Sequence, residues 1–206
     1  MSVLINASTS TGLVQSADTS GVIELQSNGT TALTVNTNEG IQILNCLGVG
    51  NATPSTSGAG ITFPASQSAS SDANTLDDYE EGTWTPTIIG TTTAGTASYS
   101  QNAARYTKIG RMVFIETYIS WSGGTGSGNL RLAGLPFTAA NVDVFPGFVI
   151  SYFENVAMTA NNFPMLYVVK NNTEAVFVQC PTGGGANNSI PYDAAGAIQL
   201  SGCYTV

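Results

Sequence analysis

The sequence of 206 residues contains no histidine and very few basic side chains. Without histidine, the chain cannot form a Ser-His-Asp or Cys-His nucleophile system or a histidine-ligated zinc site. Only 5 Lys and Arg stand against 13 Asp and Glu, which gives a net charge of −8. Binding to nucleic acid phosphates needs clustered basic side chains, so this balance argues against nucleic acid as a partner.

Cysteine is also scarce, and long apolar runs are missing. Cys46, Cys180 and Cys203 are odd in number and far apart, which fits neither a metal-ligand spacing nor a disulfide framework. We interpret them as small buried apolar residues. No segment approaches the ~20 apolar residues of a membrane span. The opening MSVLINASTSTG lacks the basic and apolar regions of a signal peptide. We therefore expect synthesis in a cytoplasm and no membrane insertion.

Charged residues make up 9% of the chain, far below the ordinary ~25%. Surface polarity must therefore come mainly from Ser, Thr, Asn, Gln and Gly. Neutral polar surfaces of this kind are common on extracellular and virion β-proteins, in which neighbouring chains cover much of the surface.

Composition divides the chain into three parts. Residues 1–50 show short apolar β segments separated by turns, among which Asn28-Gly29 is a strong hairpin signal. No aromatic residue precedes Phe63, so this part cannot bury enough surface alone, and we expect it to intertwine with identical chains. The alternative is a disordered polar arm. Residues 51–76 are rich in Ser, Ala, Gly and Pro and predict an extended linker.

Residues 77–206 predict a single all-β domain, because short strand-like segments alternate with turn signals and helical periodicity is missing. The segment 111–121, RMVFIETYISW, alternates with apolar residues on both faces, which is typical of a central strand in a sandwich. The predicted fold is thus an antiparallel, jelly-roll-like β-sandwich preceded by a β-rich stalk or attachment segment.

The segment NTLDDYEEGTWTPTI, residues 74–88, places Asp77, Asp78, Glu80 and Glu81 within five residues. Paired carboxylates can cleave glycosidic bonds and carboxylates can bind hard cations, but the spacing matches no known calcium loop. We favour a structural turn whose acids form ion pairs in the same or a neighbouring chain. The basic partners that we expect are Arg105, Lys108 and Arg111. No catalytic residue, cofactor or metal is predicted.

Aromatic side chains can stack on sugar rings, so Trp84, Trp121 and Tyr152 are candidates for receptor contact, although core packing is the default for tryptophan on a strand. The loops 122–129 and 181–193 combine glycine with amide side chains that can bind sugar hydroxyls, while turn chemistry explains them equally well. The further candidates in these loops are Asn187, Asn188 and Tyr192.

The phrases TLDDYEEGTWTPTI, YTKIGRMVFIE and LAGLPFTA together resemble a module of bacteriophage tail-fibre and related virion structural proteins. The likeness covers roughly residues 40–206 and is specific in 74–137. It implies a homotrimeric, elongated virion appendage. Since the family has no uniform enzymatic activity to carry over, we predict that the chain is not an enzyme. Its N-terminal part would attach to other virion proteins of the tail or head, and its β-domain would contact the host, including bacterial surface glycans. The alternatives are a capsid or tail decoration protein without a receptor role and a polysaccharide depolymerase.

Overall fold

The computed structural model describes residues 22–35, 41–66, 70–72 and 74–206. The chain divides into two compact units, Met1–Ser68 and Ala69–Val206. Every regular element is a strand, and no helix in the described ranges is long and apolar enough to cross a membrane. The all-β prediction is therefore confirmed. The expectations for residues 1–21 lie outside the described residues.

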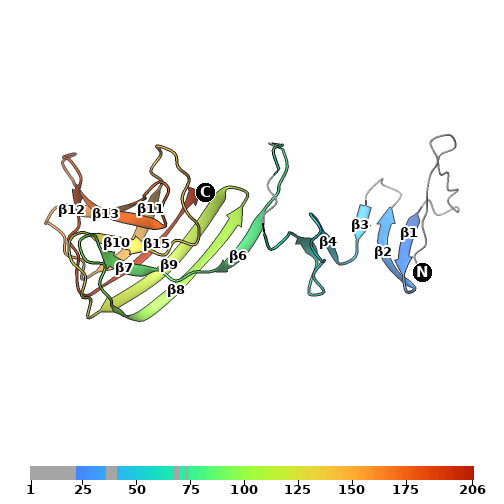
Figure 1. Ribbon diagram of the computed structural model, residues 1–206, viewed down its shortest axis with the longest axis horizontal. Helices are drawn as coiled ribbons and strands as arrows, with labels where there is room; N and C mark the ends of the chain where they lie inside the picture. The colour runs from blue at the N-terminus through green and yellow to red at the C-terminus, as the bar shows by residue number, and fades with distance from the viewer. Residues whose placement is uncertain (1–21, 36–40, 67–69, 73) are drawn as a thin grey trace. The chain divides into compact units, whose positions relative to one another are not determined.

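The N-terminal unit contains a three-stranded antiparallel sheet and a separate parallel strand pair (Figure 1). Asn28 and Gly29 have positive φ angles of 51° and 75° and connect the first two strands, so the expected hairpin forms. The segment 51–76, which was expected to be an extended linker, contributes a strand of its own, and the boundary between units falls after Ser68. The strands of this unit are β1 (Ile23–Ser27), β2 (Thr30–Val35), β3 (Ile41–Ile43), β4 (Cys46–Gly48) and β5 (Gly60–Thr62).

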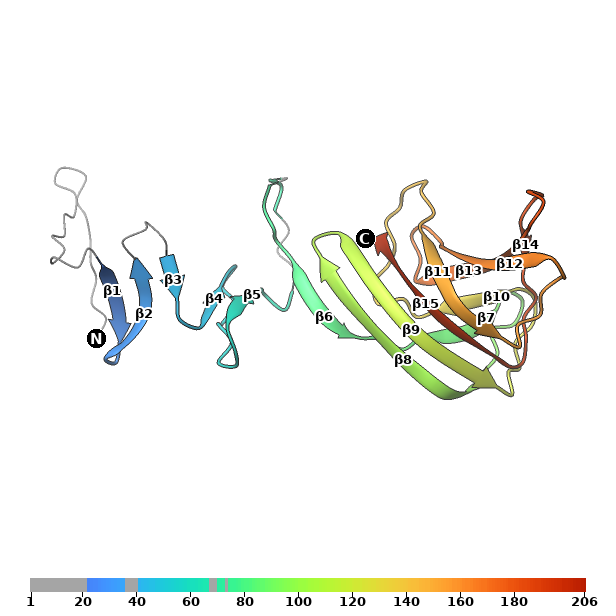
Figure 2. The same ribbon diagram turned by 180° about the vertical axis from the view of Figure 1, so that it is seen from behind.

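The C-terminal unit is built on one 10-stranded sheet in which all pairs are antiparallel. Its strand order is β6-β8-β9-β15-β11-β12-β13-β10-β7, with β14 added beside β13, and Figure 2 shows it from behind. The strands are β6 (Tyr79–Thr83), β7 (Thr87–Gly90), β8 (Ser98–Ile109), β9 (Met112–Ser122), β10 (Leu130–Ala133), β11 (Gly147–Glu154), β12 (Asn162–Val168), β13 (Glu174–Pro181), β14 (Asn188–Ser189) and β15 (Gly196–Thr205).

This sheet curls so that its two halves enclose the main hydrophobic core, and a smaller cluster of Val176, Val178 and Cys180 lies apart from it. Ile115 and Ile119 of β9 meet Leu132, Leu166 and Phe177 of the opposite half, and each is at most 4% exposed. The two layers expected of a sandwich are thus two halves of one continuous sheet. Only one face of β9 packs into this core, whereas the alternation in the sequence was interpreted as two buried faces.

The edge strands of the sheet, β6 and β7, follow one another directly in the sequence. Only three residues connect them, and Trp84 and Pro86 of this link are buried. The Asn102 side-chain amide donates to the Pro86 carbonyl at 3.1 Å, and the Ile88 amide donates to the Tyr99 hydroxyl at 2.9 Å. Side chains of β8, the second strand from one end of the sheet, therefore hydrogen-bond to the link and to the start of β7 at the other end.

The last strand is fixed to the core by Tyr204, which is 1% exposed. Its hydroxyl donates to the Phe137 carbonyl at 3.0 Å and accepts from the Phe137 amide at 3.1 Å. Its ring meets Phe148 edge to face, with centroids 6.3 Å apart. Burial raises the pKa of Tyr204 to about 12, although its hydrogen bond to the Phe137 backbone works against that rise.

This raised pKa predicts loss of stability at alkaline pH. Tyrosine in the unfolded chain ionises near pH 10, so the contribution of Tyr204 is complete below pH 10 and disappears as the pH rises toward 12. We expect denaturant unfolding to show roughly 1–2 kcal/mol of extra loss at pH 11 from this group. Tyr204→Phe should be less stable at pH 7, because the Phe137 backbone loses its partner, but should show a shallower alkaline decline. Equal declines in both proteins would contradict this account.

Candidate binding surface

Strand alternation separates the acids that the sequence places together. Glu80 and Glu81 are neighbours on β6, so their side chains point to opposite faces of the sheet. The Tyr106 hydroxyl donates to Glu80, and the Tyr79 hydroxyl donates to Glu81. The hydrogen bond to Glu80 is the main reason why the pKa of Tyr106 rises to about 12.

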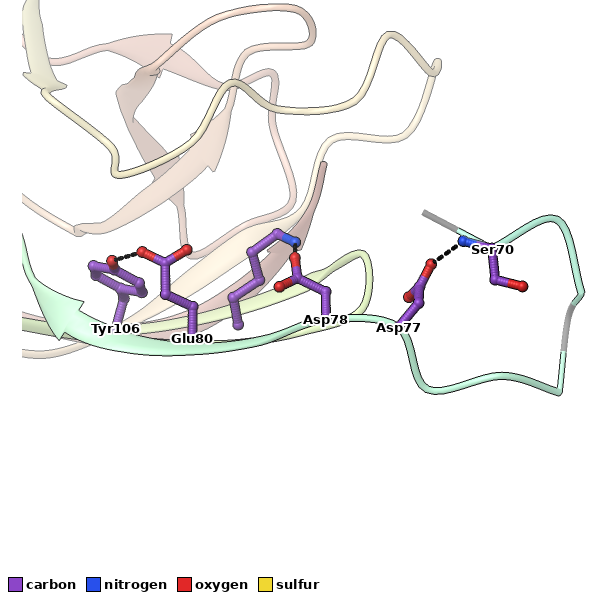
Figure 3. Close-up of polar contacts among 6 residues, drawn as sticks. Ser70, Asp77, Asp78, Glu80 and Tyr106 are labelled. Carbon is purple, nitrogen blue, oxygen red and sulfur yellow. Dashed lines mark hydrogen bonds and ion pairs between the residues drawn. The ribbon is translucent and has the colours of Figure 1, made fainter. Parts of the chain in front are cut away.

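The other two acids contact different partners (Figure 3). Asp77 accepts a hydrogen bond from the Ser70 backbone amide at 2.7 Å, and Asp78 forms an ion pair with Lys108. Within the described part of the chain, no group of three or more acids, cysteines or histidines could hold a metal ion. The segment therefore forms four separate contacts at the entrance to the domain.

The Asp78–Lys108 ion pair is buried, with side chains 8% and 4% exposed. The Lys108 ammonium also lies over the Phe137 ring, 5.7 Å from its centroid. Of the three expected basic partners, Lys108 alone meets one of the acids among the described residues, and Arg105 and Arg111 form no ion pair there. Two further ion pairs that the sequence did not suggest join Arg131 to Glu174 and Lys170 to Asp143.

Both tryptophans proposed for receptor contact are core residues. Trp84 is 8% exposed and Trp121 is 2% exposed. Their indole N–H groups donate to the backbone carbonyls of Arg105 and Asp193, at 3.2 and 3.0 Å. Burial and hydrogen bonding leave neither ring face available, so the prediction that Trp84 and Trp121 contact a receptor is wrong.

The two loops expected to contact a receptor lie side by side. The Tyr192 amide donates to the Gly128 carbonyl and the Gly124 amide donates to the Ala194 carbonyl, both at 2.8 Å. Tyr192 is half-buried and packs against the core, and a Cβ atom at Gly126 would lie 2.5 Å from its ring. Tyr192 therefore supports the two loops from the core side, and little of its ring is exposed to solvent.

The remaining receptor candidates are accessible. Asn187 and Asn188 are exposed, and Asn187 accepts a hydrogen bond from the Cys180 thiol at 3.0 Å. Tyr152 is 40% exposed and meets Tyr118 edge to face, with ring centroids 6.4 Å apart. Its hydroxyl donates to Glu154, which raises the pKa of Tyr152.

The outer face of β6, β8, β9 and β15 carries two adjoining hollows of about 830 and 400 Å³. We call this surface the outer groove. Arg105, Glu116 and Ser201 line both hollows and stand next to each other across three neighbouring strands. Phe114 and Glu81 also line the larger hollow, and Tyr118 and Gln199 line the smaller one.

The outer groove offers the groups that carbohydrate recognition uses. Arg105 is exposed and has a guanidinium that suits carboxylate or phosphate substituents, because its donors form a rigid fork. Glu116 and Gln199 can accept hydrogen bonds from sugar hydroxyls, and the Phe114 and Tyr118 rings can pack on apolar sugar edges. In the sequence, Phe114, Glu116 and Tyr118 alternate with the residues that are buried in the core, and this alternation indicates an outer face. From the sequence, both faces of this strand were predicted to be buried.

No family model and no curated protein matches this chain. Its fold is similar to part of the crystal structure of the Dettilon tailspike protein (gp208), with a TM-score of 0.50 and 17% sequence identity. The similarity covers 62% of this chain and 24% of the tailspike chain, so this chain matches about a quarter of that protein. At this identity the likeness establishes a shared β fold.

The buried ion pair generates a prediction about stability. Lys108→Met keeps a long unbranched side chain but removes the ammonium from Asp78 and from the Phe137 ring, so Asp78 stays buried without its partner, which should cost about 3–5 kcal/mol in denaturant unfolding. The matched control is Lys170→Met, because its pair with Asp143 is largely exposed and should cost at most ~1 kcal/mol. Losses of equal size in the two variants would show that the buried pair has no special weight.

Proposed function

We propose that this chain is a non-enzymatic component of a bacteriophage tail appendage, and that its C-terminal unit contacts the surface of the host bacterium. The observation that carries the proposal is the fold likeness between this chain and a tailspike protein. The resemblance of TLDDYEEGTWTPTI and YTKIGRMVFIE to a tail-fibre module points in the same direction. The virion is the corresponding location, and the corresponding partners are other virion proteins and further copies of the chain, as a homotrimer.

The separation of the acids in residues 77–81 supports a binding role. Glycosidases need two carboxyl groups placed on either side of one bond. Here Glu80 and Glu81 point to opposite faces, and Asp78 is buried against Lys108. The acids of this segment therefore do not face one another across a single bond, which supports our proposal of adhesion.

Within the C-terminal unit, the outer groove is the surface that we assign to the host glycan. It combines an exposed guanidinium, carboxylate and amide groups and aromatic rings within one hollowed face. A single groove of this kind binds weakly, but three identical grooves on one appendage multiply weak contacts into avidity. Bacterial surface polysaccharides repeat the same unit many times and so suit such binding.

The test is binding of the purified full chain to surface polysaccharides extracted from a panel of bacterial strains. For the strain that binds best, Arg105→Ala combined with Tyr118→Ala should weaken binding by about 10-fold or more, because a charge-assisted contact and a stacking surface are both lost. Biolayer interferometry with immobilised polysaccharide measures this change.

Lys170→Ala is the control. Lys170 lies outside the outer groove, and its substitution removes one positive charge, as Arg105→Ala does. Binding that is unchanged in the double variant would remove the groove from the proposal. Absence of binding across the whole panel would contradict host attachment and favour a structural protein of the particle without a receptor role.

A further inference from the structure

The three-stranded sheet of the N-terminal unit carries six aliphatic side chains in two adjoining rows on one of its faces. Strand register places one row of three residues across the sheet and a second row beside it. Alternate residues of a strand share a face, so both rows lie on the same side. The two rows, which we call the aliphatic face, are Ile23, Val35 and Ile41, followed by Leu25, Leu33 and Ile43.

The opposite face of the same sheet is polar. Glu24, Thr34 and Gln42 form one row across it. Glu24 accepts hydrogen bonds from the side chains of Gln26 and Thr31, both at 3.3 Å. Glu24 is the one charged residue within β1, β2 and β3, so the charge of the sheet lies wholly on the side away from the aliphatic face.

Among the described residues, nothing buries the aliphatic face, although Leu33 and Val35 on its central strand are half-buried. Ile23, Leu25, Ile41 and Ile43 are 36–67% exposed, and no residue in 22–35 or 41–66 with a described side chain is buried. A small sheet needs a covered apolar face to be stable in water, and an exposed patch on the order of a few hundred Å² marks an interaction site. These four exposed side chains mark the face as one that packs against another surface.

We propose that the aliphatic face is the self-association surface of the protein, where it packs against the same face of two further copies of this chain. The face contains no charge and no hydrogen-bonding side chain, so its partner must be equally apolar over the same two rows. A symmetric copy meets that requirement residue by residue, and closed symmetry is the usual form of homo-oligomers. Packing three faces around one axis also keeps Glu24 of each copy outside, which avoids repulsion between chains of net charge −8.

This inference rests on the proposed function, because it takes the homotrimer from there. It adds the residues through which the three chains would contact one another. Leu33 lies on the central strand of the sheet and in the middle of its row, so it would lie nearest the axis. Its neighbour Thr34 points to the polar face. The two positions form a matched pair for substitution.

The experiment is light scattering on the full chain carrying either Leu33→Lys or Thr34→Lys. The unsubstituted chain should give about 64 kDa, three times the 21.2 kDa of one chain. Leu33→Lys should reduce the mass threefold, to that of a single chain, whereas Thr34→Lys should keep the trimer because it adds the same charge beside Glu24. Near-ultraviolet circular dichroism of the buried Trp84 and Trp121 checks that the C-terminal unit stays folded.

A second measurement does not depend on dissociation. Leu33→Cys and Thr34→Cys are treated with a short bis-maleimide, and the covalent dimer near 42 kDa is quantified above the background of the unsubstituted chain. More cross-linking at position 33 than at position 34 supports the proposal, and equal or lower cross-linking overturns it. A monomeric unsubstituted chain, or equal masses for the two lysine variants, also overturns it. Polysaccharide binding measured on the same samples reports on the proposed function separately.

Discussion

The C-terminal unit depends on one constraint, which is that its two edge strands are consecutive in the sequence. Only three residues separate β6 from β7, so the strands at the two ends of the sheet order must lie close together. A flat sheet of 10 strands would hold its edges tens of ångströms apart, since neighbouring strands lie about 4.8 Å apart. The sheet therefore has to curl, and curling encloses the core between its halves. The link itself contributes to the core, because its Trp84 and Pro86 are buried.

The same curl determines which surfaces remain for binding. Residues that face inward across β9 and β15 become core, and the residues between them form the outer groove. Because the apolar inward face is fully used by the opposite half of the sheet, the outer face can carry Arg105, Glu116 and Gln199 without destabilising the core. The domain can thus vary this surface while its packing stays the same.

Local signals in the sequence predicted the strands well. The hairpin at Asn28-Gly29 depended on positive φ angles that this pair tolerates, and the alternation in 111–121 identified a strand. Local signals could not predict which distant strands and side chains pair with each other. The partner of Asp78 depends on the register of β6 against β8, which turns Lys108 inward and Arg105 outward. The burial of both tryptophans depends on the curl of the sheet, and the outer groove was missed because an exposed apolar residue such as Phe114 resembles a core residue in sequence.

The pairing of β6 with β8 has a mechanical consequence. The chain enters the C-terminal unit at β6, which is bonded to β8 over five residue pairs in antiparallel register. Tension applied along the incoming chain pulls β6 parallel to its own axis, so the five pairs share the load and must break together rather than one after another. The buried Asp78–Lys108 pair lies at the loaded end of this strand and resists the first displacement. A domain held in this way can keep its shape while its incoming chain is under load.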